Sequence, residues 1–226
     1  MAASQVQYWN NRVAAASSLT VSISGTTANN LLVVFFSCAN SGGVANNIST
    51  SGWTTFQKYA QSGGAGNLVV AAAYKIADGT ETAVAWNANT SADIVGSVVE
   101  ISGTATSSVL DTSGIFNPVA VSASTAYSVG ALTPTQAGIG IIGAMYNTSA
   151  NATACTIGGG YTEWFEWNYT TTYDPEHCVG TATYTSGDQE PTATITQSIR
   201  LGIITGLFKE ALVAKNVSHL LCLGTG

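Results

Sequence analysis

The run Leu-Leu-Val-Val-Phe-Phe-Ser-Cys at residues 31–38 decides the fold class of this chain. It is an almost continuous apolar run, short and rich in Val and Phe. Such a run is typical of a β-strand that is buried on both faces, whereas a half-buried strand alternates apolar and polar residues. Residues 31–38 therefore predict a strand deep inside a β-structure.

Strand patterns continue on both sides of this run. Residues 19–24, Leu-Thr-Val-Ser-Ile-Ser, alternate as a half-buried strand should. Turn-forming residues follow at 77–80 and 87–92, between further strand-like segments. These segments are 67–76, 82–88, 93–101, 127–132, 137–146, 162–169, 178–185, 192–200 and 202–209. Many short strands and no capped helical pattern predict an all-β fold, an antiparallel β-sandwich that is jelly-roll-like.

The composition does not shift sharply at mid-chain, so we expect one β-sandwich domain over residues 19–209. Residues 1–18 are polar and Ala-rich, and they predict an extended N-terminal arm anchored by Tyr8 and Trp9. Residues 210–226 form a C-terminal tail. This tail is either a further strand on its own domain or an arm buried against a neighbouring subunit. Its apolar residues are Leu212, Val213, Leu220 and Leu221.

Charged residues make up 8 % of the chain, against about 25 % in ordinary soluble domains. The formal net charge is −6, and Lys and Arg form no cluster. A nucleic-acid-binding protein needs a basic patch to contact phosphates, so we expect no nucleic-acid partner. A surface of short neutral side chains favours a subunit that packs into an assembly, or a protein that works outside the cell.

Membrane insertion and secretion leave recognisable patterns that this sequence lacks. No apolar run approaches the roughly 20 residues of a membrane span. The first residues show no basic segment followed by an apolar one, so we expect neither a signal peptide nor a transmembrane segment.

Four cysteines, at positions 38, 155, 178 and 222, are far apart and form no Cys-x-x-Cys pair. Metal-binding spacing is therefore absent, and free thiols are favoured because a chain of this length does not need disulfides to fold. If one disulfide forms, we expect Cys155–Cys178, since these residues flank one hairpin region.

A nucleophilic site would need a Ser or Cys beside a His and an orienting acid. Asp174, His177 and Cys178 are the only such group, and neighbours in sequence rarely converge on one reacting atom. A solvated loop is therefore the favoured interpretation. We expect no enzymatic activity.

The aromatic stretch 162–173 offers two further hypotheses. Glu163 and Glu166 could form a carboxylate pair for sugar hydrolysis, but strand alternation predicts that they point to opposite faces. By the same alternation Trp164 shares a face with Glu166, while Phe165 lies on the other, apolar face. Core packing explains the Phe165 face, and Trp164 could stack on a glycan ring.

The acidic turns at 78–81 and 186–191 are the only candidates for calcium. Neither has the alternating acidic residues of a calcium loop, so plain hairpin turns are favoured. We expect no metal and no cofactor.

A series of motifs along the chain is similar to a known kind of domain. The motifs are Asn30–Val34, Gly52–Thr54, Ala73–Glu81, Val99–Gly103 with Leu110 and Asp111, Gly159–Thr162, and Gly206–Lys209. Their order resembles a β-sandwich domain that recurs in tailed-phage virion proteins and bacterial surface proteins. The resemblance implies a role in capsid decoration, tail appendages or receptor binding, and it brings no catalytic residues.

Composition and resemblance together predict a non-enzymatic phage virion structural protein, assembled in the host cytoplasm. The most concrete form is a capsid decoration (cement) protein. Its partners would be the major capsid protein or other virion subunits, and further copies of itself in a homo-oligomer. The alternative is a tail-fibre or surface adhesion module that binds a host glycan through Trp53, Trp86 or Trp164. Adhesion requires an open, exposed Trp, whereas decoration predicts buried ones.

Overall fold

The computed structural model describes residues 2–40, 52–60, 67–121, 123–147, 154–167, 175–197 and 200–212. Within these ranges the chain forms β-strands and no helix. The strands are β1 (Ser4–Ser22), β2 (Leu31–Asn40), β3 (Thr54–Ala60), β4 (Asn67–Ile76), β5 (Ala83–Ser102), β6 (Leu110–Ala120), β7 (Ala126–Ser128), β8 (Gly138–Asn147), β9 (Cys155–Gly158), β10 (Thr162–Trp167), β11 (Pro175–Tyr184), β12 (Thr192–Ile195) and β13 (Arg200–Lys209).

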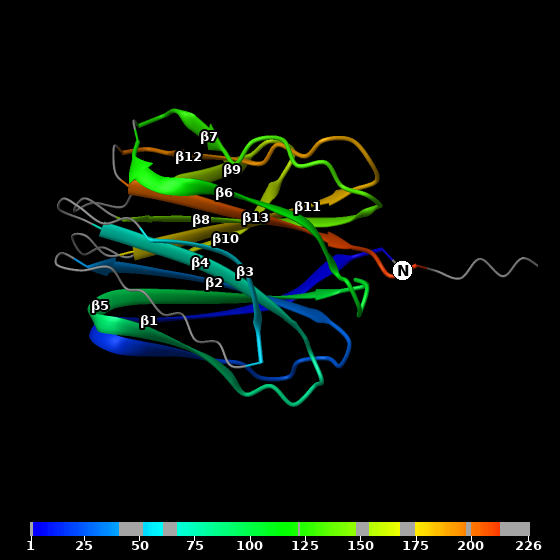
Figure 1. Cartoon of the computed structure of the whole chain (residues 1–226), viewed down its shortest axis with the longest axis horizontal. Helices are drawn as coiled ribbons and strands as arrows, with labels where there is room; N and C mark the ends of the chain where they lie inside the picture. Colours follow the sequence, from blue (N-terminus) through cyan, green and yellow to red (C-terminus); the bar gives the residue numbers. More distant parts are fainter. Residues whose placement is uncertain are drawn as a thin grey trace, which may run out of the picture.

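Two five-stranded antiparallel sheets pack face to face (Figure 1). The first sheet has the order β1-β5-β2-β4-β3 and the second has the order β10-β11-β8-β13-β6. The expected all-β, antiparallel sandwich is confirmed. The jelly-roll detail is not confirmed, since each sheet is built from one contiguous half of the chain.

The core between the sheets explains why residues 31–38 are apolar at almost every position. Leu31, Val33 and Phe35 face the second sheet and belong to the inner core. Val34 and Phe36 face the opposite way and belong to a separate outer cluster. The prediction of a strand buried on both faces is therefore confirmed.

The outer face of the first sheet is covered by a ribbon formed from β1 and β5. Residues 93–101 of β5 pair with β2, whereas residues 83–87 pair with residues 18–22 of β1. Register shifts between Val13 and Ser18 allow the ribbon to curl back (Figure 1). Trp86 of the ribbon then meets Phe36 edge-on, with ring centroids 4.6 Å apart.

This ribbon changes two expectations. The expected turn at 87–92 lies inside β5, because the strand bends there without ending. Residues 4–18 were expected in an arm, yet they form the first part of β1 and pair with β5 from Ser4 onward. The reason is that a polar edge strand needs only one partner strand to satisfy its backbone, so it carries no strong apolar signal.

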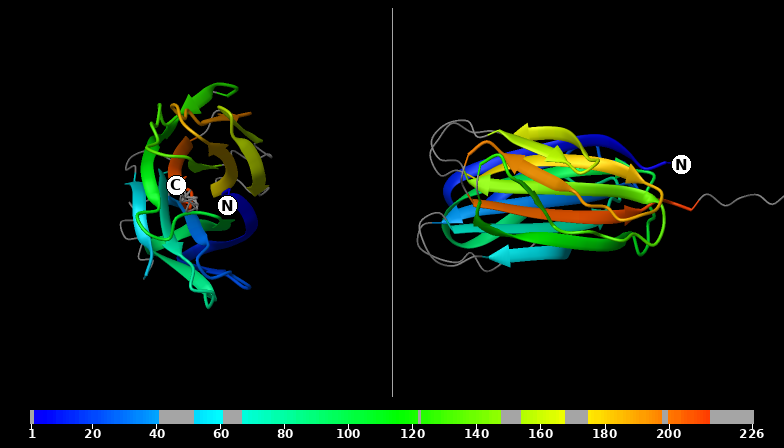
Figure 2. Two further views of the ribbon diagram at one scale, coloured as in Figure 1. Left: turned by 90° about the vertical axis from the view of Figure 1, so that its right-hand side faces the viewer. Right: turned by 90° about the horizontal axis from the view of Figure 1, so that it is seen from above.

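The outer face of the second sheet carries a small sheet of order β7-β12-β9. Its buried residues Ala193 and Ile195 pack on Ile142 and Ala144 of β8. The start of β1 and the end of β13 lie together at one end of the sandwich (Figure 2), where the Ala3 amide donates to the Glu210 carboxylate at 3.3 Å.

The two halves of the chain are built alike. The order β3-β4-β2-β5-β1 matches β10-β11-β8-β13-β6 strand for strand. The central strands β2 and β8 each have 10 residues, and both pair along their whole length with a 10-residue strand, β4 or β11. β3 and β10 share a bulge, at Phe56 and at Trp164, and both bulge residues pack on the inner core. The two large sheets are thus an internal repeat of one five-stranded unit, to which the second half of the chain adds the small sheet β7-β12-β9.

Candidate functional site

The three tryptophans predicted to bind a ligand are all incorporated into packed clusters. Trp86 is fully buried under the ribbon. Trp53 is half-buried and packs on the cluster beneath the ribbon. Trp164 is half-buried and packs on the inner core. Trp9 also packs under the ribbon, so these tryptophan side chains contribute to the packing of the fold.

Trp164 lies on a different face from the one expected. Glu163 pairs with Gly180 and Phe165 with Val179, so Trp164 is the extra residue of a bulge. The bulge breaks the alternation, and as a result Trp164 and Phe165 both pack on the inner core. A bulge cannot be read from alternation alone.

Tyr8 joins these two side chains across the open side of the sandwich. Its ring stacks on Phe165 with centroids 4.2 Å apart and meets Trp164 edge-on at 5.9 Å. Tyr8 comes from β1 and its partners from β10, which are the edge strands of the two sheets. Nearby, the Gln5 amide donates to the Thr181 hydroxyl.

We call Tyr8, Trp164 and Phe165 the aromatic rim, and Val6 lies two residues before Tyr8 on β1. Val6 is 45 % exposed and Tyr8 is 43 % exposed, and both are among the few large apolar side chains exposed in the described residues. Sequence reasoning selected Tyr8 and Trp164 but not Val6 or Phe165. The two aromatic pairs, at 8–9 and 164–165, were the available signal.

The bulge also changes the geometry of Glu163 and Glu166. Gly180 and Cys178, their partners on β11, share a face, so both carboxylates point toward β9. The expectation that they point apart is therefore wrong. Glu166 Oε1 accepts hydrogen bonds from the Tyr146 hydroxyl and the Cys155 amide, each at 2.6 Å. The Cys155 contact ties β9 to the second sheet, and the Tyr146 contact joins β8 and β10 within that sheet.

His177 and Cys178 lie on opposite faces of β11, and neither is in a solvated loop. His177 is fully buried between the sheets, with Nε2 2.7 Å from Ser37 Oγ and Nδ1 2.9 Å from Ser97 Oγ. Burial lowers the pKa of His177 to about 3. Cys178 lies on the outer face instead, and Asp174 lies outside the described residues.

Cys38, Cys155 and Cys178 are buried free thiols, as favoured by the sequence. Cys222 lies outside the described residues.

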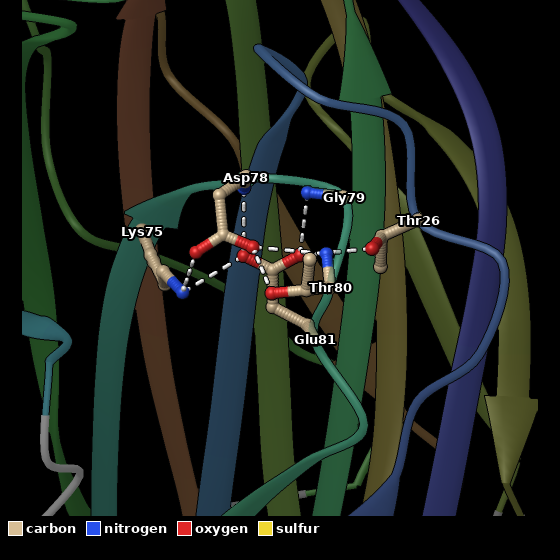
Figure 3. Close-up of polar contacts among 6 residues, drawn as sticks. All are labelled: Thr26, Lys75, Asp78, Gly79, Thr80 and Glu81. Carbon is tan, nitrogen blue, oxygen red and sulfur yellow. Dashed lines mark hydrogen bonds and ion pairs between the residues drawn. The ribbon is translucent and has the colours of Figure 1, made fainter.

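The acidic turn at 78–81 uses its carboxylates internally (Figure 3). Glu81 pairs with Lys75 at 2.8 Å and accepts hydrogen bonds from Thr26 and from the Asp78 and Gly79 amides. Burial acts to raise the pKa of Glu81, but the bonds from Lys75, Asp78 and Thr26 outweigh it and lower the pKa to about 2.

Neither acidic turn closes a hairpin, which corrects the expectation. The turn at 78–81 joins β4 to β5 across the end of β2, and the turn at 186–191 joins β11 to β12 in a different sheet. Across the described ranges no group of His, Cys, Asp and Glu is arranged to hold a metal ion.

The end of the sandwich that carries both chain ends has shallow, open depressions. Three of them, of about 500, 430 and 540 Å³, are lined mostly by Thr, Ser, Ala and Gln. Leu212, at the start of the tail, is 86 % exposed. Val213, Leu220 and Leu221 lie outside the described residues.

Fold and candidate sites together define an all-β protein, an antiparallel β-sandwich with an aromatic rim between two sheet edges. No family model, curated protein or solved structure matches the chain. Among the described residues there is no helix long and apolar enough to cross a membrane.

Proposed function

We propose that this chain is a non-enzymatic structural protein of a phage virion, most concretely a decoration protein on the capsid. The placement of the tryptophans carries the proposal. Trp86 is fully buried, and Trp53 and Trp164 pack on core clusters. Adhesion through stacked sugars requires an open aromatic platform, whereas a packed shell component uses its aromatic side chains internally.

The hydrogen bonds that the carboxylates accept from within the chain support the same function. Glu81, Glu100, Glu166 and Asp111 each accept two or more hydrogen bonds from within the chain. These four of the twelve acidic residues therefore already have hydrogen-bond partners within the chain. A surface with little net repulsion can be buried against a neighbouring subunit without leaving unpaired charge.

The aromatic rim is the surface that we assign to this contact. It lies between β1 and β10, each of which has a partner strand on one side only. Apolar side chains beside unpaired strand edges are suited to contacts with another protein chain. In this proposal the rim packs on the major capsid protein.

The test uses heads of the encoding phage assembled without this chain. We expect the purified protein to sediment with these heads and to raise their resistance to heat. The double variant Val6→Ser, Tyr8→Ser should bind at least tenfold more weakly, because it removes the exposed apolar side chain of the rim and the exposed one beside it on β1. Val119→Ser is the matched control, since Val119 is exposed on β6, at the opposite sheet edge. Binding to tails, or no binding to heads, would overturn the proposal.

Glycan adhesion remains the second candidate because Tyr8 and the half-buried Trp164 lie beside the polar pair Gln5 and Thr181. A glycan array distinguishes the two functions. Binding that is lost in Trp164→Ala, with a folded variant, would favour adhesion.

A further inference from the structure

Two cysteines on adjacent layers meet inside the cluster beneath the small sheet. Cys155 begins β9 in the three-stranded sheet, and Cys178 lies in β11 of the second sheet. They are 4 % and 0 % exposed, and both belong to the same apolar cluster. The thiol of Cys155 is close enough to raise the pKa of Cys178.

The backbone around them independently brings the two residues together. Cys178 is the direct partner of Glu166 across the β10–β11 ladder. The Cys155 amide donates to Glu166 Oε1 at 2.6 Å. Both cysteines therefore lie beside one carboxylate, on two different strands, and both side chains are buried in the same cluster between the layers.

We propose that Cys155 and Cys178 are a latent disulfide pair that closes when the protein meets an oxidising small-molecule disulfide such as oxidised glutathione. One thiol, as the thiolate, attacks a sulfur of the oxidant, and one glutathione leaves. The second thiolate then attacks the protein sulfur of this mixed disulfide, and the second glutathione leaves. The protein loses two electrons and two protons, which the two glutathione molecules take up.

Access to the pair requires opening of β9. The thiol contact and burial together raise the pKa of Cys178, so the closed structure holds little thiolate. β9 has four residues and is an edge strand of the smallest sheet. Short edge elements open locally far more often than the whole fold unfolds. The reaction is therefore slow in native protein and faster in dilute denaturant.

The closed bond would join the small sheet covalently to the sandwich. It spans residues 155–178, a segment that includes β9 and β10. Such a cross-link constrains the unfolded chain and raises the unfolding temperature by roughly 5–10 °C. In a reducing cytosol the pair stays as thiols, and outside the cell it can close. This inference does not depend on the proposed virion function.

The experiment treats the full chain with excess oxidised glutathione and compares it with the reduced protein. We expect a product lighter by two hydrogen atoms, a linked peptide pair containing residues 155 and 178, and a higher unfolding temperature that reductant reverses. Peptide mapping of the wild type alone tests the linkage, even if a variant fails to fold.

Matched variants show which cysteines produce the linked peptide and the rise in unfolding temperature. Cys155→Ser and Cys178→Ser should each abolish the linked peptide and the temperature shift. Cys38→Ser should retain both, because Cys38 is buried in a different cluster, beneath the ribbon. An unchanged mass, a stable glutathione adduct, or a link to another cysteine would overturn the proposal.

Discussion

The imidazole of His177 lies between Ser37 and Ser97, each of which comes from a strand of the opposite sheet. A neutral imidazole donates at one nitrogen and accepts at the other, so two hydroxyls satisfy it. While the imidazole is neutral, its complete burial leaves neither ring nitrogen without a hydrogen-bond partner. Protonation would place a charge in the inner core.

The stability of the protein should therefore fall as the pH drops below 6.5. In the unfolded chain His177 titrates near 6.5, whereas in the fold its pKa is about 3. Between these values the unfolded state binds the extra proton, and the loss is about 1.4 kcal/mol for each pH unit. Urea unfolding at pH 7, 5 and 4 measures this slope.

The variant His177→Gln distinguishes the contribution of His177 to the pH dependence of stability from that of the carboxylates. Its amide can donate and accept but does not titrate, so the difference between wild type and variant should shrink steadily from pH 7 to pH 4. Parallel pH profiles for the two proteins would contradict the assignment.

Glu100 is a second fully buried polar side chain, and its carboxylate holds three segments together. Oε1 accepts from the Thr27 amide at 2.8 Å and from Asn30 Nδ2 at 2.7 Å, and Oε2 accepts from Gln7 Nε2 at 2.6 Å. Glu100→Ala removes the acceptor of all three hydrogen bonds and should cost roughly 2–4 kcal/mol in urea unfolding. Exposed Glu163→Ala should change stability by less than about 0.5 kcal/mol, and equal losses would contradict the role of Glu100.

At the scale of elements, the ribbon lies so close to the first sheet that one position must be glycine. A Cβ atom on Gly96 would lie 2.5 Å from the Phe36 ring and 2.8 Å from the Val21 side chain. Phe36 belongs to β2 and Val21 to the ribbon, so Gly96 marks the point where the two layers press together.

Gly96→Ala should therefore destabilise the protein by about 1–3 kcal/mol through overpacking. The same change in a Phe36→Leu background should cost less, because the nearest ring atoms are gone. Urea unfolding of the two single variants and the double variant gives the coupling between the positions. Additive effects would show that the ring does not limit the space at Gly96.

Strands buried on both faces were predictable from the sequence, whereas of the edge strands of the two large sheets only β10 was expected over its whole length. Residues 31–38 and 137–146 were expected as strands, and they lie at the centres of the two sheets as β2 and β8. β1 was missed over residues 4–18 because an edge strand needs no apolar face. On β10, Phe165 lies on the core face as expected, but Trp164 lies there too and Glu163 shares the face of Glu166, because one bulge residue breaks the alternation between Glu163 and Phe165.

At the scale of the whole molecule, the internal repeat makes the inner core a shared interface between two similar halves. The motifs Gly52-Trp53-Thr54 and Gly160-Tyr161-Thr162 precede matching bulges, and both glycines have positive φ. The sequence held this signal, but two short motifs do not reveal that the strands around them pair in the same order.

Neither half should fold alone, because each would expose one side of the inner core. The first half contributes Leu31, Val33 and Phe35, and the second contributes Ile141 and Ile204. We expect fragments 1–107 and 108–226 to be insoluble or poorly structured when expressed separately. Expressed together, they should co-purify and regain cooperative unfolding, since the break lies in the segment between β5 and β6, which is the one connection between the two five-stranded sheets. Sedimentation velocity distinguishes this complex from a dimer of the first fragment, whose sheet has the same strand order as that of the second. Two fragments that unfold cooperatively as separate monomers would show that the halves are independent domains and that the inner core is not what holds them together.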